Sequence, residues 1–286
     1  MTLPELAIAS TPDSDDAFYY DALETGRVAL PVFRPVFRRE PMADLNRAAL
    51  SGRYGVTAIS SVVYPQIADR YAVLSLGTSV GRGYGPVLVA RTPLAPAALA
   101  GRRVGVPGLS TTGCFLLRWL CPKALAAEMP FDEIAAAVVS GALDAGVMIH
   151  EELLYWPRLG LQRVVDLGAE WCRAHGLPLP VGLNVVRRDL GPEPMERICT
   201  ALRRSLQHAL DHPAEALNRV SRFGRGREGQ CTERFVSMFA NRDSLHMPAD
   251  VRAALPVLFR QASGEVLSTI DIVEGFDTAA CLAAAA

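Results

Sequence analysis

The stretch "LPLPVGLNVVRR", residues 177–188, decides the fold that this sequence predicts. Its apolar and β-branched residues predict one long strand. Because an α/β pattern occurs twice along the chain, such a strand can return the chain from a second unit to the first. A matching outward crossing is expected at residues 88–92, where Pro93 and Pro96 interrupt the pattern.

Short apolar runs alternate with segments of helical period from the start of the chain. In the first unit this alternation predicts a mostly parallel sheet, with strand 5–10, helix 15–26, strand 28–38, helix 42–52 and strand 55–60. The second unit is expected to contain strands 102–108, 144–149 and 163–167 and helices 112–121, 130–142 and 151–159. The last hundred residues are expected to be nearly all helical.

Two α/β units joined by two crossings predict a hinged α/β fold of two lobes. Its natural ligand site is the cleft between the lobes. We assign residues 1–90 and 187–286 to a discontinuous first lobe, which includes the helical C-terminal segment. Residues 91–186 form the second lobe.

Composition and charge favour a soluble protein with a small ligand. The 286 residues are 50% hydrophobic and carry a formal net charge of -1, so no global field would attract nucleic acid or an anionic membrane. No apolar run approaches the roughly 18 residues needed to span a bilayer. Six cysteines without a C-x-x-C pair indicate neither a zinc site nor a disulfide framework. We expect a cytoplasmic monomer or homodimer without a metal.

The turn after the first expected strand carries four polar residues, "DSDD" at positions 13–16. Asp13 or Ser14 can cap the following helix, and the next two acids suit the positive end of its dipole. Capping is the preferred explanation for Asp13 and Asp15. Because strand-to-helix turns lie at the ligand-binding edge of an α/β sheet, Asp16 is kept as a candidate binding residue.

A second strand-to-helix turn, "VPGLSTTGCFLL" at residues 106–117, offers an anion site. Backbone N–H groups, three hydroxyls that include those of Thr111 and Thr112, and the helix dipole can hold a carboxylate or phosphate. A helix N-cap is the equally weighted alternative, because a cap requires only one hydroxyl. Ser60 and Ser61, at the end of the third expected strand, form a weaker version of this turn.

His150 follows the expected strand 144–149 and begins a helix, again at the edge of the cleft. An imidazole there can accept a proton near neutral pH, although Glu151 and Glu152 oppose the effect of the positive helix end. The residues alone favour the alternative that this histidine only starts a helix. The remaining histidines are expected at the surface: His175, His208, His212 and His246.

Other catalytic and nucleotide-binding motifs are rejected. The glycine-rich "GRGYGP", residues 81–86, runs into an expected strand and opens no helix, so it is not a dinucleotide-binding loop. No G-x-S-x-G or H-E-x-x-H motif occurs in the sequence. Hydrolase and metalloenzyme functions are therefore disfavoured.

Six segments, in this order, resemble the 1,4-dihydroxy-6-naphthoate synthase (MqnD) family of the futalosine pathway to menaquinone. The resemblance covers residues 5–260 or so, and the set is specific although each segment alone is weak. The segments are "TPDSDDAFYYDAL" (11–23), "DLNRAALSGRYGVTAIS" (44–60), "GRGYGPVLVA" (81–90), "PGLSTTGCFLL" (107–117), "GALDAGVMIHE" (141–151) and "GLPLPVGLNVVRR" (176–188).

The resemblance implies a fold like that of type II periplasmic binding proteins. It also implies conversion of cyclic dehypoxanthine futalosine, a small-molecule carboxylate substrate, to 1,4-dihydroxy-6-naphthoate without a metal or redox cofactor. In this family the histidine of "IHE" is the proton acceptor, which corresponds to His150. The implied substrate contacts lie at a strand end and in the Thr-Thr turn: Ile59, Ser60, Ser61, Thr111, Thr112 and Gly113.

The sequence also departs from the family pattern, and other functions fit the same fold. Where family members have S-P-C-P-N-D-T-F, Asp15 stands for Asn and Ala17 for Thr, so ligand contacts of these two are not carried over. Gly113 replaces a common alanine. The alternatives are a solute-binding receptor for a small organic anion and a chorismate dehydratase of the same pathway. The "IHE" and "GRGYGP" segments favour the synthase over the dehydratase.

Overall fold

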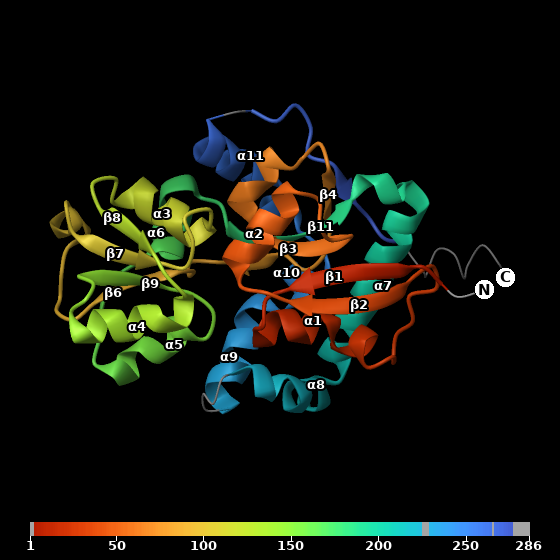
Figure 1. The fold of residues 1–286 in the computed structure, drawn as a ribbon, viewed down its shortest axis with the longest axis horizontal. Coiled ribbons are helices and arrows are strands. Elements are labelled where there is room, and N and C mark those ends of the chain that lie inside the picture. The colour runs from red at the N-terminus through yellow and green to blue at the C-terminus, as the bar shows by residue number, and fades with distance from the viewer. Residues whose placement is uncertain (1–2, 225–228, 265, 277–286) are drawn as a thin grey trace.

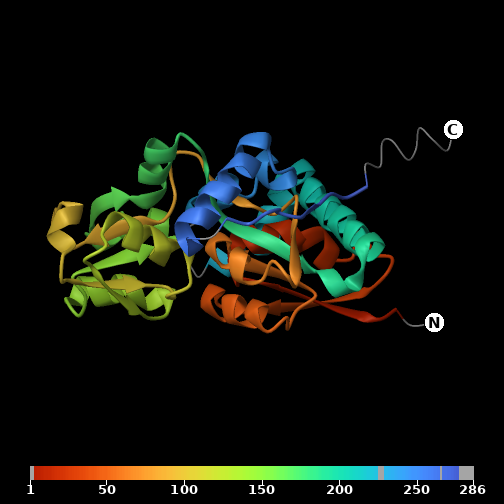
Figure 2. The same ribbon diagram turned by 90° about the horizontal axis from the view of Figure 1, so that it is seen from above.

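The computed structural model describes residues 3–224, 229–264 and 266–276, which fold into two α/β lobes (Figure 1). The first lobe contains a seven-stranded sheet and the second a five-stranded sheet. The lobes lie side by side when seen from the front and from above (Figure 2). The predicted two-lobe α/β fold is confirmed.

The sheet of the first lobe has the order β12-β4-β11-β3-β1-β2, with β5 paired to β11. Its strands are β1 (Glu5–Ser10), β2 (Arg34–Arg39), β3 (Val56–Ser60), β4 (Tyr71–Leu74), β5 (Ser79–Gly81), β11 (Leu179–Arg187) and β12 (Ile272–Val273). The helices of this lobe are α1 (Ser14–Glu24), α2 (Met42–Leu50), α7 (Pro192–Asp211), α8 (Pro213–Val220), α9 (Gly229–Phe239), α10 (Arg242–Leu245) and α11 (Ala249–Ser263). The C-terminal third is mainly helical, as predicted.

The sheet of the second lobe has the order β10-β6-β9-β7-β8. Its strands are β6 (Val87–Ala90), β7 (Arg103–Val106), β8 (Leu125–Glu128), β9 (Ala145–Met148) and β10 (Gln162–Asp166). The helices are α3 (Thr112–Leu120), α4 (Phe131–Ser140), α5 (Glu152–Tyr155) and α6 (Leu167–His175).

Strand β11 is the predicted return crossing, and it lies in the middle of the first sheet. It runs antiparallel to β3, β4 and β5. In the second sheet β6, the outward crossing, runs antiparallel to β9 and β10. Both sheets are therefore mixed, and the expectation of a mostly parallel sheet is wrong for the strands that arrive from the opposite lobe.

Each crossing strand pairs in the sheet that it enters. Strand β6 ends at Ala90 and pairs in the second sheet, while β11 begins at Leu179 and pairs in the first. The predicted lobe boundaries at residues 90/91 and 186/187 lie at the far ends of these strands, so they assign β6 to the first lobe and nearly all of β11 to the second, whereas each strand pairs in the sheet of the other lobe.

Prolines explain two differences from the predicted elements. The strand expected at 28–38 begins only at Arg34, as β2, which lies at a sheet edge where Pro35 is tolerated. The helix expected at 151–159 is the short α5 followed by a 3-10 turn, because Pro157 has no N–H to continue the α-helical bonding. Four strands were not predicted from the sequence: β4, β5, β8 and β12. They have two to four residues each, too few to show a clear period.

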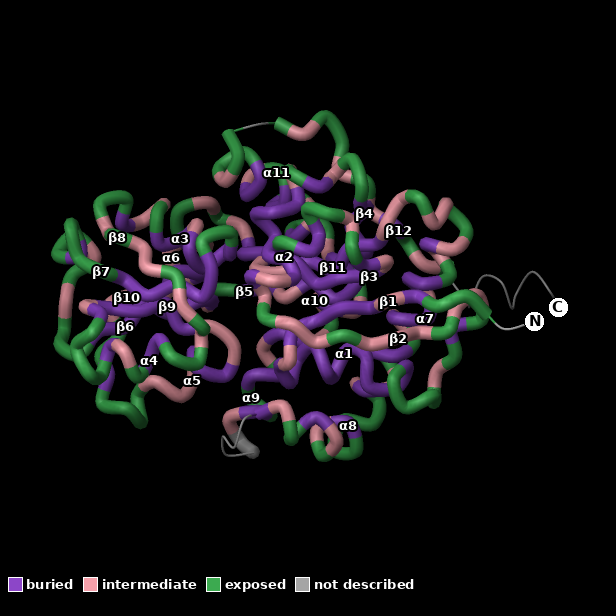
Figure 3. The backbone as a smooth tube through the Cα atoms, in the orientation of Figure 1, coloured by how far each residue is buried: buried purple, intermediate pink, exposed green. Residues whose placement is uncertain are grey.

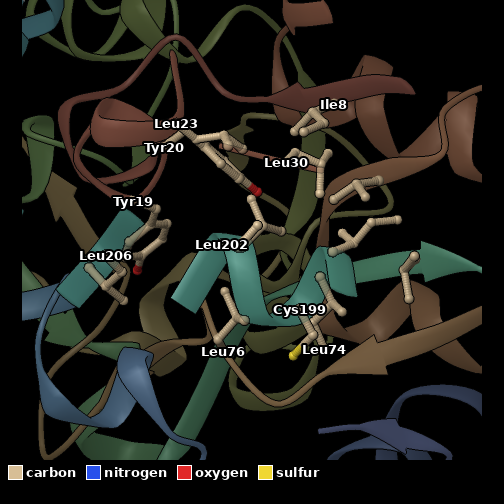
Figure 4. Packing of buried hydrophobic residues seen from close by; sticks show 14 of the residues in the cluster. Ile8, Tyr19, Tyr20, Leu23, Leu30, Leu74, Leu76, Cys199, Leu202 and Leu206 are labelled. Atoms are coloured by element: carbon tan, nitrogen blue, oxygen red, sulfur yellow. The ribbon is translucent and has the colours of Figure 1, made fainter. Parts of the chain in front are cut away.

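One apolar core of the first lobe lies between α1 and α7 (Figure 4). Tyr19, Tyr20 and Leu23 of α1 pack in the same cluster as Leu202 and Leu206 of α7, and all five are buried. Each fully buried leucine contributes about 1.5–3 kcal/mol. The purple segments of Figure 3 show that central strands such as β3 and β9 are buried, whereas the edge strands β2, β8 and β10 are pink and green. This core fixes the position of α1, whose first residues reach the second lobe.

The "GRGYGP" segment has a packing role at the start of β6. A Cβ added at Gly168, in the first turn of α6, would lie 2.3 Å from the backbone oxygen of Tyr84. A Cβ added at Gly85 would lie 2.9 Å from the Cα atom of Gly168. The two glycines therefore allow α6 to approach the chain that enters the second sheet.

We expect the variant Gly168→Ala to lower the free energy of unfolding by about 1–3 kcal/mol, because its methyl group would overlap backbone atoms that cannot move freely. Urea denaturation followed by circular dichroism measures the change. The variant Ala174→Ser, on the exposed side of the same helix, is the control and should stay within about 0.5 kcal/mol. An unchanged unfolding midpoint for Gly168→Ala would contradict the close packing of α6.

Candidate active site

A cavity between the lobes brings together residues from both. Its walls come from the β1–α1 turn, α2, the end of β3 and α9 in the first lobe, and from α3 and the β9–α5 turn in the second. Its empty volume is about 630 Å³ including the part open to solvent. The lining mixes apolar side chains with a small set of hydroxyls, carboxylates and one imidazole.

His150 lies in the turn between β9 and α5 and lines this cavity. Its φ of +53° is the only positive φ of a non-glycine residue in the described ranges. Such a backbone costs on the order of 1–3 kcal/mol, and residues held in it cluster at functional sites. The α-helix begins only at Glu152. His150 is therefore not simply the first residue of a helix.

Asp13 lies beside His150, although the two residues come from different lobes. Its Oδ2 atom is 2.9 Å from Nδ1 of His150, and its side chain is 0% exposed. Asp13 occupies the N-cap position of α1, but its side chain makes no capping hydrogen bond. Capping, the preferred explanation from the sequence, is thus wrong for Asp13.

A second pair joins the lobes next to the first. Glu151 Oε1 accepts hydrogen bonds from both N–H and Oγ of Ser14, the N–H at 3.3 Å. A third link runs through Asn46 of α2, whose Oδ1 accepts from the N–H of Ser60 at 2.9 Å and whose Nδ2 donates to the backbone oxygen of Ser110 at 3.3 Å. These contacts hold both lobes around the cavity.

Asp15 and Asp16 add two carboxyl groups to the cavity wall. Asp16 accepts hydrogen bonds from N–H and Oγ1 of Thr11 at 2.7 and 2.6 Å. Oδ1 of Asp15 is buried and has no hydrogen-bond partner among the described residues. Burial, and then the neighbouring carboxylates, raise the pKa of Asp15 well above its usual value. Burial also raises the pKa of Asp16, opposed by its hydrogen bonds from Thr11.

The Thr-Thr turn places the N-terminus of α3 at the cavity. Oγ1 of Thr111 accepts from the N–H of Cys114 at 3.2 Å, so Thr111 is the N-cap. Oγ1 of Thr112 donates to the backbone oxygen of Val181 at 2.7 Å. The N–H groups of Thr112 and Gly113, in the first turn, have no intrahelical acceptor. These two amides and the helix dipole can hold a carboxylate.

Six of the predicted site residues line this one cavity: Asp16, Ser60, Thr111, Thr112, Gly113 and His150. Ile59 and Ser61 do not line it. Ile59 is fully buried in an apolar cluster behind the sheet, because side chains alternate along β3. Ser61 is also fully buried, at the start of the 3-10 turn after this strand.

Several wall residues have no counterpart in the sequence prediction. Phe235 and Phe239, four residues apart on α9, form an apolar wall and are 2% and 4% exposed. This spacing places both rings on one face of the helix. Nothing in the neighbouring sequence predicts that this face lines a cavity. Thr11 and Ser79 also line the cavity.

Residues outside the cavity form structural contacts. The ring of His175, expected at the surface, packs 3.9 Å from the ring of the buried Trp171. Within the described ranges, no three histidine, cysteine, aspartate or glutamate side chains are grouped as metal ligands would be. No helix in that part of the chain is long and apolar enough to cross a membrane.

Two α/β lobes with a cavity between them define the class of periplasmic-binding-protein-like folds. The alkanesulfonate-binding protein SsuA from Xanthomonas axonopodis pv. citri, solved with bound MOPS, shares this fold. Its TM-score is 0.65 at 12% identity, over 84% of this chain and 85% of that chain. At this identity the likeness concerns the fold alone. A crystal structure of a protein from Archaeoglobus fulgidus is more similar, with a TM-score of 0.87 and 39% identity over 91% of this chain and 97% of that chain.

The particular family follows from the sequence comparisons. The family model described as menaquinone biosynthesis matches residues 6–264. A 1,4-dihydroxy-6-naphthoate synthase from Thermus thermophilus is 40% identical over 264 residues, which are 92% of this chain and 96% of that relative. The chain belongs to this menaquinone-biosynthesis family, and the resemblance to its 1,4-dihydroxy-6-naphthoate synthases is confirmed.

The raised pKa of Asp15 predicts a pH-dependent stability. The folded protein holds this proton to a higher pH than the unfolded chain does, so the fold loses stability as pH rises from the usual carboxyl range through the raised pKa. We therefore expect Asp15→Asn to raise the melting temperature at pH 8 and to have less effect near pH 4, as measured by calorimetry.

The exposed variant Asp69→Asn is the control for loss of one charge, since the side chain of Asp69 is 73% exposed. A lower melting temperature for Asp15→Asn at pH 8 would show that the ionised carboxylate stabilises the cavity wall.

Proposed function

We propose that this chain is a 1,4-dihydroxy-6-naphthoate synthase, which converts cyclic dehypoxanthine futalosine to 1,4-dihydroxy-6-naphthoate in the cytoplasm. The observation that carries the proposal is the largely enclosed imidazole of His150, in the interlobe cavity of a chain from a menaquinone-biosynthesis family. The name of the Thermus thermophilus relative supports the same reaction.

The substrate carboxylate docks at the N-terminus of α3. The first-turn amides of Thr112 and Gly113 and the positive end of the helix dipole supply the attraction there. The aromatic part of the substrate then lies in the cavity, where Phe235 and Phe239 offer an apolar wall. Exclusion of water by this wall strengthens the electrostatic contacts at the carboxylate.

His150 acts as the general base. It removes the proton whose loss starts expulsion of the sugar-derived ring and aromatisation of the bicycle. A positioned base of this kind contributes about 10² to 10⁴ in rate. No step requires a metal or a redox cofactor, because the reaction consists of a proton transfer and an elimination.

We expect His150→Ala to lower kcat by about 10²- to 10⁴-fold, with a much smaller effect on KM, because the base acts on the bound substrate. Purified protein is incubated with cyclic dehypoxanthine futalosine, and the naphthoate is measured by mass spectrometry. The control is His212→Ala, an exposed histidine of the first lobe, which should retain wild-type turnover. Near-normal turnover by His150→Ala would exclude its role as the base.

The same assay separates the alternatives. Tight binding of the futalosine derivative by the wild type without turnover would identify a receptor. A dehydrated product formed from chorismate in a parallel incubation would identify the sister enzyme. Either result would contradict the proposed reaction.

We expect Thr112→Val to raise KM by about tenfold, with kcat within about threefold. The hydroxyl that holds the start of α3 against the backbone oxygen of Val181 is lost, and a hydrogen bond contributes about 1 kcal/mol. Thr112→Ser keeps the hydroxyl and is the control. Steady-state kinetics on the futalosine derivative give both constants, and an unchanged KM would place the carboxylate elsewhere.

A further inference from the structure

We infer that Asp13 is the positioning residue for the base, holding the imidazole of His150 with its proton on Nδ1 and its lone pair on Nε2. This inference rests on the proposed function, in which His150 removes a proton from the substrate. The sequence pattern alone explains Asp13 as a helix cap. The role inferred here is a different one.

The pair lies at the distance of a buried ion pair, although the direction of the contact is not that of a regular hydrogen bond. Oδ2 of Asp13 lies 2.9 Å from Nδ1 of His150, and the two side chains are 0% and 13% exposed. A carboxylate with no exposed surface is costly unless it has a partner. α1 does not use this carboxylate as its cap, and the imidazole of His150 is a partner that becomes cationic when it is protonated.

The short contact between Oδ2 and Nδ1 favours one tautomer of the neutral ring. An ionised carboxylate can only accept, so the ring nitrogen that faces it must carry the proton. With the proton on Nδ1, the lone pair lies on Nε2, and this is the nitrogen that can take a proton from the substrate. After that transfer, the carboxylate faces an imidazolium, and the favourable charge pairing stabilises the protonated base.

The imidazole is also held from its other sides. The ring of Phe131 meets it edge-on with centroids 4.9 Å apart, and that of Phe235 lies at 6.5 Å. The next residue, Glu151, is bonded to Ser14, the neighbour of Asp13. Two successive links between the same turns therefore fix both the backbone and the ring of His150.

Other charged groups surround the imidazole and contribute to its titration. Asp15 and Asp16 come from α1, and Glu151 and Glu152 follow His150 in the chain. The groove on the outer side of His150 carries Asp44, Arg47, Glu128 and Asp132. The contact that carries the inference is that of Asp13, whose Oδ2 lies 2.9 Å from Nδ1 of the ring.

The kinetic test uses Asp13→Asn in the full chain. Loss of the carboxylate should lower kcat on cyclic dehypoxanthine futalosine by about 10²-fold while KM stays within about threefold. A nearby anion raises the pKa of an imidazole, so its removal should move the acidic limb of the kcat/KM profile to lower pH. Asp13→Glu, which keeps the charge, should retain more activity than Asp13→Asn.

The matched control is Asp132→Asn, which removes a carboxylate from the outer groove near His150. It should leave kcat within about twofold of the wild type and should not move the acidic limb of the kcat/KM profile. If Asp13→Asn shifts neither kcat nor the acidic limb, or if Asp132→Asn shifts both equally, the positioning role is overturned.

A measurement without substrate separates this inference from the proposed reaction. Nitrogen NMR of the ¹⁵N-histidine-labelled wild type, with the His150 signals assigned by their loss in His150→Gln, reports the tautomer directly. We expect the Nδ1–H tautomer in the wild type and a lower imidazole pKa in Asp13→Asn. An Nε2–H tautomer in the wild type would overturn the inference even if the enzyme is active or the variant does not fold. If the wild type shows the Nδ1–H tautomer but produces no naphthoate, the pairing of Asp13 with His150 stands and the proposed reaction is rejected.

Discussion

The junction between the first residues of α1 and the turn after β9 is the contact on which the site depends. Asp13 and Ser14 come from one lobe, and His150 and Glu151 come from the other. Separation of the lobes would break both pairs at once and open the cavity. The proposed base is therefore held in place only when the lobes meet, which couples closure around a ligand to the placement of the imidazole.

The site contains unfavourable interactions that the apolar core of the first lobe offsets. The left-handed backbone of His150 is strained, and Asp15 has a buried oxygen without a partner among the described residues. Opposing these costs, α1 is anchored against α7 by large buried side chains such as Tyr20 and Leu202. Costs of this kind are concentrated where function requires a fixed geometry, and the scaffold supplies the necessary stability.

The sequence predicted the elements whose signals are local. The crossing strand β11, the Thr-Thr turn and the position of His150 at a strand end all follow from patterns within about twelve residues. The partner of His150 could not be found in this way. Ser14 and Glu151, which lie beside that pair, are 137 positions apart in the sequence, and a capping role explained Asp13 adequately by itself. The aromatic wall on α9 was missed for the same reason, since only the tertiary fold brings it to the cavity.

A crystal structure of the protein with bound 1,4-dihydroxy-6-naphthoate tests the central claim most directly. The account predicts that the product occupies the interlobe cavity, with its carboxylate hydrogen-bonded to the amides of Thr112 and Gly113. We also expect Nε2 of His150 to face the hydroxylated ring while Nδ1 stays beside the carboxylate of Asp13. A product bound outside the cavity, or one with its carboxylate against His150, would contradict the account.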